Sequence, residues 1–167
     1  MSLVVFAAGN PSRGDDALGP LLMAELEALA LPDVHLVSDF QLQIEHALDL
    51  DGRDLALFID AGTGTPAPYL FREIRPITGQ APNSHALAPE AVLQVYADIR
   101  RADPPPAFVL CIRGEEFELG GDLSAAAQEH LLAARTHLQR CMACADAGSW
   151  RKLVAAGEDL LRVQLQA

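Results

Sequence analysis

The stretch from Gly9 to Pro20, GNPSRGDDALGP, constrains the fold more than any other part of the chain. It follows an apolar run, residues 3–8, that is typical of a buried strand, and leucines recur behind it at helical spacing. We therefore expect a strand, a tight turn and a helix in succession. Asp15 and Asp16 lie where this helix begins and where its dipole favours negative charge. One of them can cap the helix while the other points inwards.

Apolar runs recur along the chain and alternate with segments of helical spacing. The runs that predict further strands span residues 34–38, 55–59, 69–74 and 107–112. Helices are predicted at about 44–50, 89–101, 123–145 and 150–165, with Ser149 as the N-cap of the last. Most runs are continuous rather than alternating, which is typical of parallel strands buried on both faces. We predict an α/β fold, a three-layer sandwich in which helices cover both faces of a mainly parallel, twisted sheet of about five strands.

Length and composition limit the class of protein. The 167 residues fit one domain, 1–167, with an additional C-terminal helix at about 149–166. Half of the residues are apolar, which excludes disorder, and no apolar run reaches the roughly 18 residues of a membrane helix. The net charge of −11 argues against nucleic acid as a partner. The first strand follows no charged leader, and three cysteines, an odd count, indicate reduced thiols. We expect a cytoplasmic monomer that binds neither nucleic acid nor a membrane.

Polar side chains are predicted to meet at one edge of the sheet. In an open α/β sheet, ligands bind outside the carboxyl ends of the strands. The first strand leads to Asp15 and Asp16, the strand 55–59 leads to Asp60, and His85 lies in the connection into the helix at 89–101. Two carboxylates and an imidazole can hold Zn, Ni, Mn or Fe(II) with positions left for water or substrate. The alternatives are that Asp60 is a solvated strand end and that His85 is a loop histidine beside a helix cap.

Two other interpretations of the glycine-rich turn fit the residues less well. A phosphate cradle would need G-x-x-x-x-G-K-[ST] or G-x-G-x-x-G, and the turn has neither. A phospho-acceptor receiver module shares the acidic pair and the aspartate after the central strand, but it needs a lysine after the last strand. Arg113 and Gly114 occupy that place, and the single lysine, Lys152, lies in the final helix.

A second group of histidines and cysteines is better explained by packing. Four of them fall on one broad stripe of the helix at 123–145: His130, His137, Cys141 and Cys144. Their spacing allows a metal clip as an alternative, but thiols and histidines on a single helix without a partner loop more often reflect packing. Cys111 lies in the apolar run 107–112 and is interpreted as a core side chain.

The pattern G-N-x-x-x-G-D-D-A-L-G from Gly9 to Gly19 resembles the signature of the [NiFe] hydrogenase maturation proteases. The resemblance runs from residue 3 to about residue 140. Asp60, in FIDA, and His85, in NSH, match the family's aspartate after the central strand and its histidine before the next major helix. The family's metal-contacting acid is the second of the pair, often glutamate, and maps to Asp16. The stretch 39–48 is similar to the branch that serves soluble, bidirectional NAD-reducing hydrogenases.

The resemblance implies an endopeptidase that removes the C-terminal extension of the hydrogenase large-subunit precursor. Nickel, carried by that substrate, would be sensed by Asp16, Asp60 and His85, which are then both the metal contacts and the catalytic residues. Gly9, Asn10, Gly14 and Asp15 would form the turn that presents them. The enzyme's own site is expected to be empty until the substrate binds. A non-catalytic chaperone that senses nickel in the large subunit is the alternative.

Overall fold

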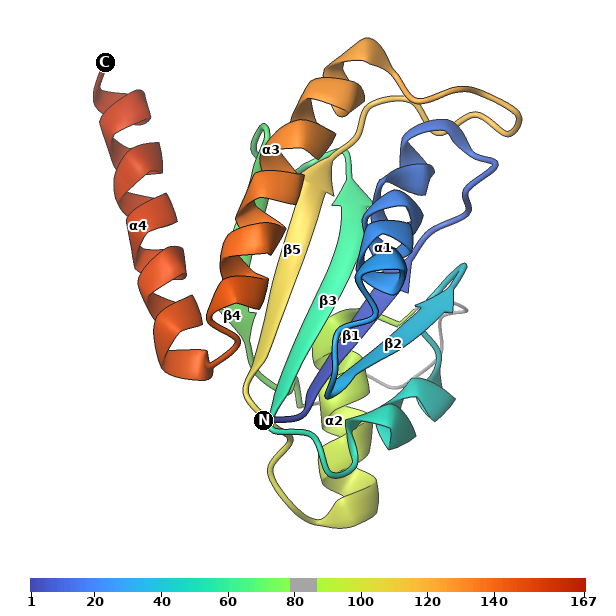
Figure 1. The fold of residues 1–167 in the computed structure, drawn as a ribbon, viewed down its shortest axis with the longest axis vertical. Helices are drawn as coiled ribbons and strands as arrows, with labels where there is room; N and C mark the ends of the chain where they lie inside the picture. The colour runs from blue at the N-terminus through green and yellow to red at the C-terminus, as the bar shows by residue number, and fades with distance from the viewer. Residues whose placement is uncertain (79–86) are drawn as a thin grey trace.

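The computed structural model describes residues 1–78 and 87–167, and within these ranges five strands form one sheet in the order β2-β1-β3-β5-β4 (Figure 1). The strands are β1 (Leu3–Ala8), β2 (Val34–Asp39), β3 (Leu55–Gly62), β4 (Tyr69–Ile74) and β5 (Ala107–Arg113). β1, β2, β3 and β5 are parallel, and β4 is an antiparallel edge strand on β5. The predicted mainly parallel sheet is confirmed.

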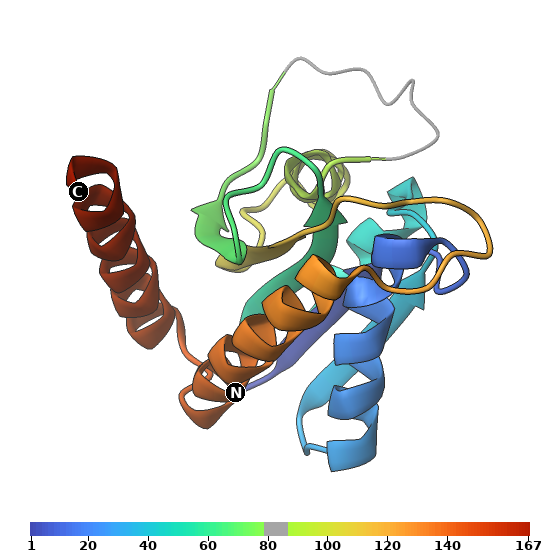
Figure 2. The same cartoon turned by 90° about the horizontal axis from the view of Figure 1, so that it is seen from above.

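Helices cover both faces of this sheet, as the continuous apolar strands predicted (Figure 2). α1 (Leu18–Leu29) and α3 (Ala125–Ala143) pack on one face, and η2 (Ile44–Leu50) and α2 (Pro89–Arg100) pack on the other. Alternate residues of β3 divide between the two cores: Leu57 and Ile59 face α1 and α3, whereas Phe58 faces the opposite layer. Phe58 stacks on Phe6 with ring centroids 4.6 Å apart. The three-layer α/β arrangement is confirmed.

The final helix, α4 (Ala147–Gln166), begins earlier than predicted. The prediction of Ser149 as its N-cap is wrong, because the Asp146 carboxylate accepts the hydrogen bond from the Ser149 backbone N–H at 2.8 Å. An N-cap side chain accepts from the second or third residue of the helix, and Asp146 has that relation to Ser149. The assignment of the chain to one domain with an additional helix stays a prediction.

α4 contacts the body of the protein mainly through its first turns. Trp150 is fully buried and donates from Nε1 to the backbone carbonyl of Cys141 at 3.0 Å. Arg151 forms an ion pair with Glu73 of β4, 2.7 Å from Nη2 to Oε1. Beyond these residues the helix stands away from the sheet (Figures 1 and 2), and large apolar side chains such as Leu165 are exposed. In the described residues, none of the helices has the length and hydropathy needed to cross a membrane.

Candidate active-site rim

The turn after β1 folds through two glycines that no other residue replaces easily. Gly9 has φ +150°, and a Cβ built there would lie 2.1 Å from the Asp16 carbonyl oxygen. Gly14 has φ +52°, in the left-handed region, and its Cβ would lie 2.4 Å from the Glu116 carbonyl oxygen. The turn then enters η1 (Gly14–Ala17) and α1. The predicted strand, turn and helix are confirmed.

Asp15 is fully buried and connects this turn to the segment between β5 and α3. Its Oδ2 accepts from the backbone N–H groups of Glu115 (2.7 Å) and Glu116 (3.0 Å) and from the Ser124 hydroxyl (2.8 Å). Its Oδ1 accepts from the Ser124 N–H at 2.8 Å. Burial raises the pKa of Asp15, but these hydrogen bonds together lower it below its ordinary value. Asp15 therefore orders the turn rather than capping the first helix.

Asp16 is only partly buried and faces the other way. Its Oδ2 accepts a hydrogen bond from the Asn10 backbone N–H at 2.8 Å. Asn10 in turn accepts from the Ser12 N–H at 2.9 Å, which closes the first part of the turn. The second carboxyl oxygen of Asp16 forms no hydrogen bond with any described residue. Asp16 is thus the member of the acidic pair with acceptor capacity left for a ligand.

Asp60 lies inside β3 rather than at its end, because β3 continues to Gly62 in register with β5. Its Oδ1 accepts from the Ala61 N–H at 2.7 Å. Burial raises the pKa of Asp60 to about 6; the Ala61 hydrogen bond opposes this shift, and the charge of Asp16 adds to it. Asp60 and Asp16 are therefore close enough to interact electrostatically. The Asp60 side chain is partly buried and lies inside the strand, so its role in the site and the alternative of a solvated strand end both stay predictions.

His85 lies outside the described residues, so its predicted place in the site stays a prediction. Within residues 1–78 and 87–167, no three side chains of His, Cys, Asp or Glu are grouped so that they could hold a metal ion. We call the carboxyl end of the sheet, with the turns that follow β1 and β3, the rim. Its described part supplies two carboxylates, Asp16 and Asp60, and the predicted third ligand, His85, belongs to the segment that is not described.

Cys111 packs against the core layer on the α2 side of the sheet, which agrees with its prediction as a core side chain, but it is only partly buried. It pairs with Asp60 across the two strands, and its half-buried thiol lies 3.0 Å from the Thr65 hydroxyl. Burial raises the pKa of this thiol; the Thr65 hydrogen bond opposes the shift, and the charge of Asp60 adds to it. The run 107–112 is buried as predicted except at Cys111, which is partly buried beside Asp60.

A second pair at this end of the sheet was not predicted as part of the site. His46 Nε2 lies 3.4 Å from an Asp39 carboxyl oxygen, and His46 Nδ1 accepts from the Gln43 N–H at 2.8 Å. The Asp39 carbonyl oxygen accepts from the Gly9 N–H at 3.1 Å, so the end of β2 is joined to the turn after β1. The sequence signal for this pair was the similarity of the stretch 39–48, which contains both residues, to one branch of the family.

The histidines and cysteines along α3 do not form a metal site among the described residues. His130 Nδ1 lies 2.9 Å from the Arg113 carbonyl oxygen, and Cys144 is exposed at the helix end. His137 is buried among aromatic rings, and burial raises the pKa of the Cys141 thiol to about 12. Packing therefore explains Cys141, which is fully buried, but not Cys144, which is exposed, and His137 keeps one ring nitrogen without a hydrogen-bond partner among the described residues.

Comparisons with known proteins agree on the fold. No protein-family profile and no curated sequence matches the chain. Among solved structures, the [NiFe] hydrogenase maturation protease HycI from Thermococcus kodakarensis has a TM-score of 0.61 and 22% identity, over 82% of this chain and 89% of the other. The hydrogenase maturating endopeptidase HybD from E. coli has a TM-score of 0.64 and 18% identity, over 83% and 90%. A hydrogenase 2 maturation peptidase from a Thaumarchaeota archaeon has a TM-score of 0.60 and 18% identity, over 85% and 98%.

Identities this low establish a shared architecture and not a shared activity. The similarity nevertheless extends over most of both chains in each pair, so it is not confined to a common strand and helix unit. The chain therefore has the fold of the [NiFe] hydrogenase maturation proteases.

Proposed function

We propose that this protein is an endopeptidase of [NiFe] hydrogenase maturation that removes the C-terminal extension of a large-subunit precursor. The observation that carries the proposal is the pair of carboxylates, Asp16 and Asp60, at the carboxyl end of the sheet in a fold shared with such proteases. Asp15, by contrast, is fully used in holding the turn, which leaves one acid of the pair for the substrate.

The chemistry of the rim suits a substrate that carries its own nickel. Asp16 has a carboxyl oxygen without a hydrogen-bond partner among the described residues, and Asp60 accepts one hydrogen bond, from the Ala61 backbone N–H. A metal ion close to both carboxylates would offset the cost of burying the Asp60 charge. With His85, these groups would complete an oxygen and nitrogen ligand set around the substrate's nickel. Cleavage then needs a polarised carbonyl and an activated water, for which nickel or a carboxylate is suited.

A processing assay on nickel-loaded large-subunit precursor tests this proposal. We expect the protein to shorten the precursor, and Asp16→Asn and His85→Ala each to abolish shortening while circular dichroism stays that of the native fold. Asp159→Asn, which changes an exposed acid on α4, is the matched control and should retain full activity.

The assay also separates the alternative function. A protein that binds the nickel-loaded precursor without shortening it would be a nickel-sensing chaperone, and the endopeptidase proposal would be withdrawn. Full activity of both variants would remove Asp16 and His85 from the site. The narrower resemblance to the branch serving NAD-reducing hydrogenases stays a prediction, to be tested by comparing precursors from different hydrogenases.

A further inference from the structure

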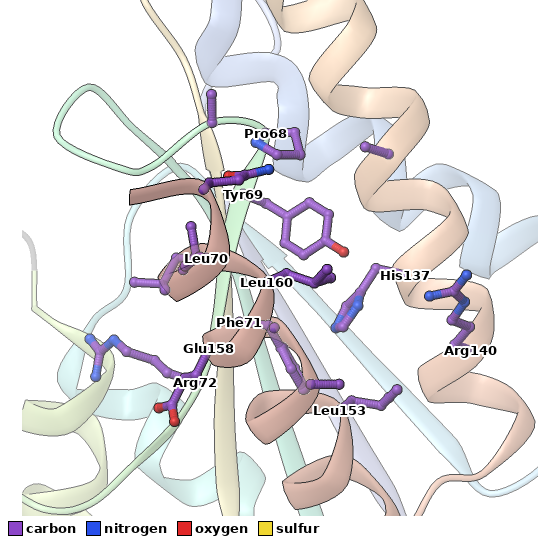
Figure 3. Close-up of a pocket in the computed structure, with 16 residues that line it drawn as sticks. Pro68, Tyr69, Leu70, Phe71, Arg72, His137, Arg140, Leu153, Glu158 and Leu160 are labelled. Atoms are coloured by element: carbon purple, nitrogen blue, oxygen red, sulfur yellow. The ribbon is translucent and has the colours of Figure 1, made fainter. Parts of the chain in front are cut away.

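A groove opens between α4, β4 and α3, away from the acidic pair. Its volume is about 420 Å³, within the roughly 300–1,000 Å³ of small-molecule sites. Figure 3 shows Tyr69 and Phe71 of β4 facing His137 and Arg140 of α3, with Leu153 and Leu160 of α4 completing the wall. We call the space bounded by these six residues the α4 groove. Most of its wall is apolar, so its few polar groups decide what it can bind.

His137 is the most unusual of these polar groups. The side chain is only 5% exposed, and its Nε2 has no hydrogen-bond partner among the described residues. The ring projects from α3 towards β4 and lies 4.9 Å from the Tyr69 ring and 4.4 Å from the Phe71 ring, centroid to centroid (Figure 3). Buried polar atoms are nearly always paired, so an unpaired one in the wall of a groove indicates a missing partner.

Arg140 and Tyr69 complete a polar end to the groove. Burial, and then the nearby charge of Arg140, lowers the pKa of His137 to about 4, so the imidazole is neutral at pH 7 and can carry its proton on Nε2. The same guanidinium opposes the rise in the pKa of Tyr69 that burial causes, and both side chains line the groove (Figure 3). Arg140 is exposed and forms no ion pair with a described acid. This end therefore presents a positive charge and two neutral donors.

The other charged residues of the wall do not cancel this charge. Arg72 is already paired with Glu90, 2.6 Å from Nη2 to Oε1. Glu158 lies on the opposite side of the groove from Arg140 (Figure 3). The groove is thus apolar along its length, with a positive end at Arg140.

We propose that the α4 groove binds a small apolar carboxylic acid. Its carboxylate accepts from the Arg140 guanidinium, the Tyr69 hydroxyl and the His137 Nε2–H, and its hydrocarbon body lies against Phe71, Leu153 and Leu160. The apolar body gains from leaving water, and the carboxylate gives the unpaired imidazole its partner. The site is separate from the acidic rim and does not depend on the proposed peptidase activity.

Octanoate, below its micelle concentration, is a suitable probe because the single tryptophan reports on the groove. The Trp150 ring lies 6.1 Å from the ring of Phe71, so binding should change its fluorescence. We expect one octanoate per chain by fluorescence and calorimetry. Arg140→Gln should weaken octanoate binding about tenfold or more, since a hydrogen bond to a charged group is lost. Arg162→Gln, an exposed change on α4, should leave octanoate binding unchanged.

Octan-1-ol, which has the same hydrocarbon chain as octanoate but no carboxylate, tests the carboxylate contact separately from the apolar contact. It should bind more weakly than octanoate and with equal affinity to the wild type and Arg140→Gln. Octanoate binding that is absent, or equal in the wild type and in a natively folded Arg140→Gln, would overturn the proposal. Equal affinity for octanoate and octan-1-ol in the wild type would overturn the carboxylate assignment.

Discussion

Replacing Asp15 by asparagine should destabilise the protein more than any comparable change at the rim. Asparagine keeps one carbonyl oxygen, which at the Oδ2 position can still accept from Glu115, Glu116 and the Ser124 hydroxyl. Its NH2 group then faces the Ser124 N–H, where Oδ1 accepted before. A buried N–H left unpaired costs about 1–3 kcal/mol, and the three remaining hydrogen bonds lose about half their strength with the charge. Asparagine also removes the cost of burying a charge, which offsets part of these losses, so we expect a net loss of about 3–4 kcal/mol in the free energy of unfolding.

Urea denaturation, followed by far-ultraviolet circular dichroism and by Trp150 fluorescence, measures this loss. For a chain of this length it corresponds to a fall in Tm of about 6–16 °C. Asp16→Asn is the matched control: Asp16 makes one hydrogen bond at a partly exposed position, so we expect a change below about 1 kcal/mol. If Asp15→Asn cost no more than Asp16→Asn, the assignment of Asp15 as the residue that orders the turn would be refuted.

The pH dependence of the same comparison has a definite sign. The pKa of Asp15 in the native state is lowered from 3.8, so below about pH 4 the unfolded chain binds more protons than the folded one. The stability that Asp15 contributes is complete above that pH and is lost as the pH falls through the lowered native pKa. The free energy of unfolding of the wild type should therefore approach that of Asp15→Asn only below about pH 4.

Three further changes test separate parts of the structure. Asp60→Asn removes a buried charge whose native pKa is about 6, so it should raise the free energy of unfolding by about 1–3 kcal/mol at pH 7. The same change should abolish processing of the precursor. Between about pH 4 and 6 the native wild type binds more protons than the unfolded chain, so the wild type, but not Asp60→Asn, should lose stability as the pH rises through this range. Gly14→Ala should cost about 2–3 kcal/mol because its Cβ meets a carbonyl oxygen at 2.4 Å, whereas Gly64→Ala, with open space around it, should be neutral in urea denaturation. Trp150→Phe loses the hydrogen bond to Cys141 and should cost about 1–3 kcal/mol by thermal unfolding, with faster hydrogen exchange in α4.

Local signals account for the part of the fold that could be predicted. Continuous apolar runs and helical spacing depend only on neighbouring residues, and they located β1, β3 and α2 to within a few residues. The residues of β4 alternate in character more than those of the central strands, which agrees with its position at the edge of the sheet. The start of α4 was misplaced because Asp146 and Ser149 are both good N-cap residues, and spacing alone does not choose between them.

The features that needed the structure are contacts between distant residues. Spacing alone does not separate Asp15 from Asp16, and the family resemblance assigned the metal contact to Asp16. The physical reason for the role of Asp15 is that its hydrogen-bond donors, in Glu115, Glu116 and Ser124, lie about a hundred positions later in the chain. The predicted strand at 107–112 was correct, but no local signal showed that Cys111 would lie beside Asp60. The groove beside α4 also depends on how a helix leaves the sheet, which hydrophobic periodicity does not encode.

The place of β5 in the sheet has a consequence for how the molecule is made. β3 and β4 follow one another in the chain, yet β5, synthesised later, lies between them and is the only strand that pairs with β4 among the described residues. During synthesis, β4 therefore has no strand to pair with until residues 107–113 have left the ribosome. Closing such long loops is entropically costly and slows folding. The segment that follows β5 also carries the donors for Asp15, so the hydrogen bonds of the acidic turn are complete only when the chain beyond β5 is in place.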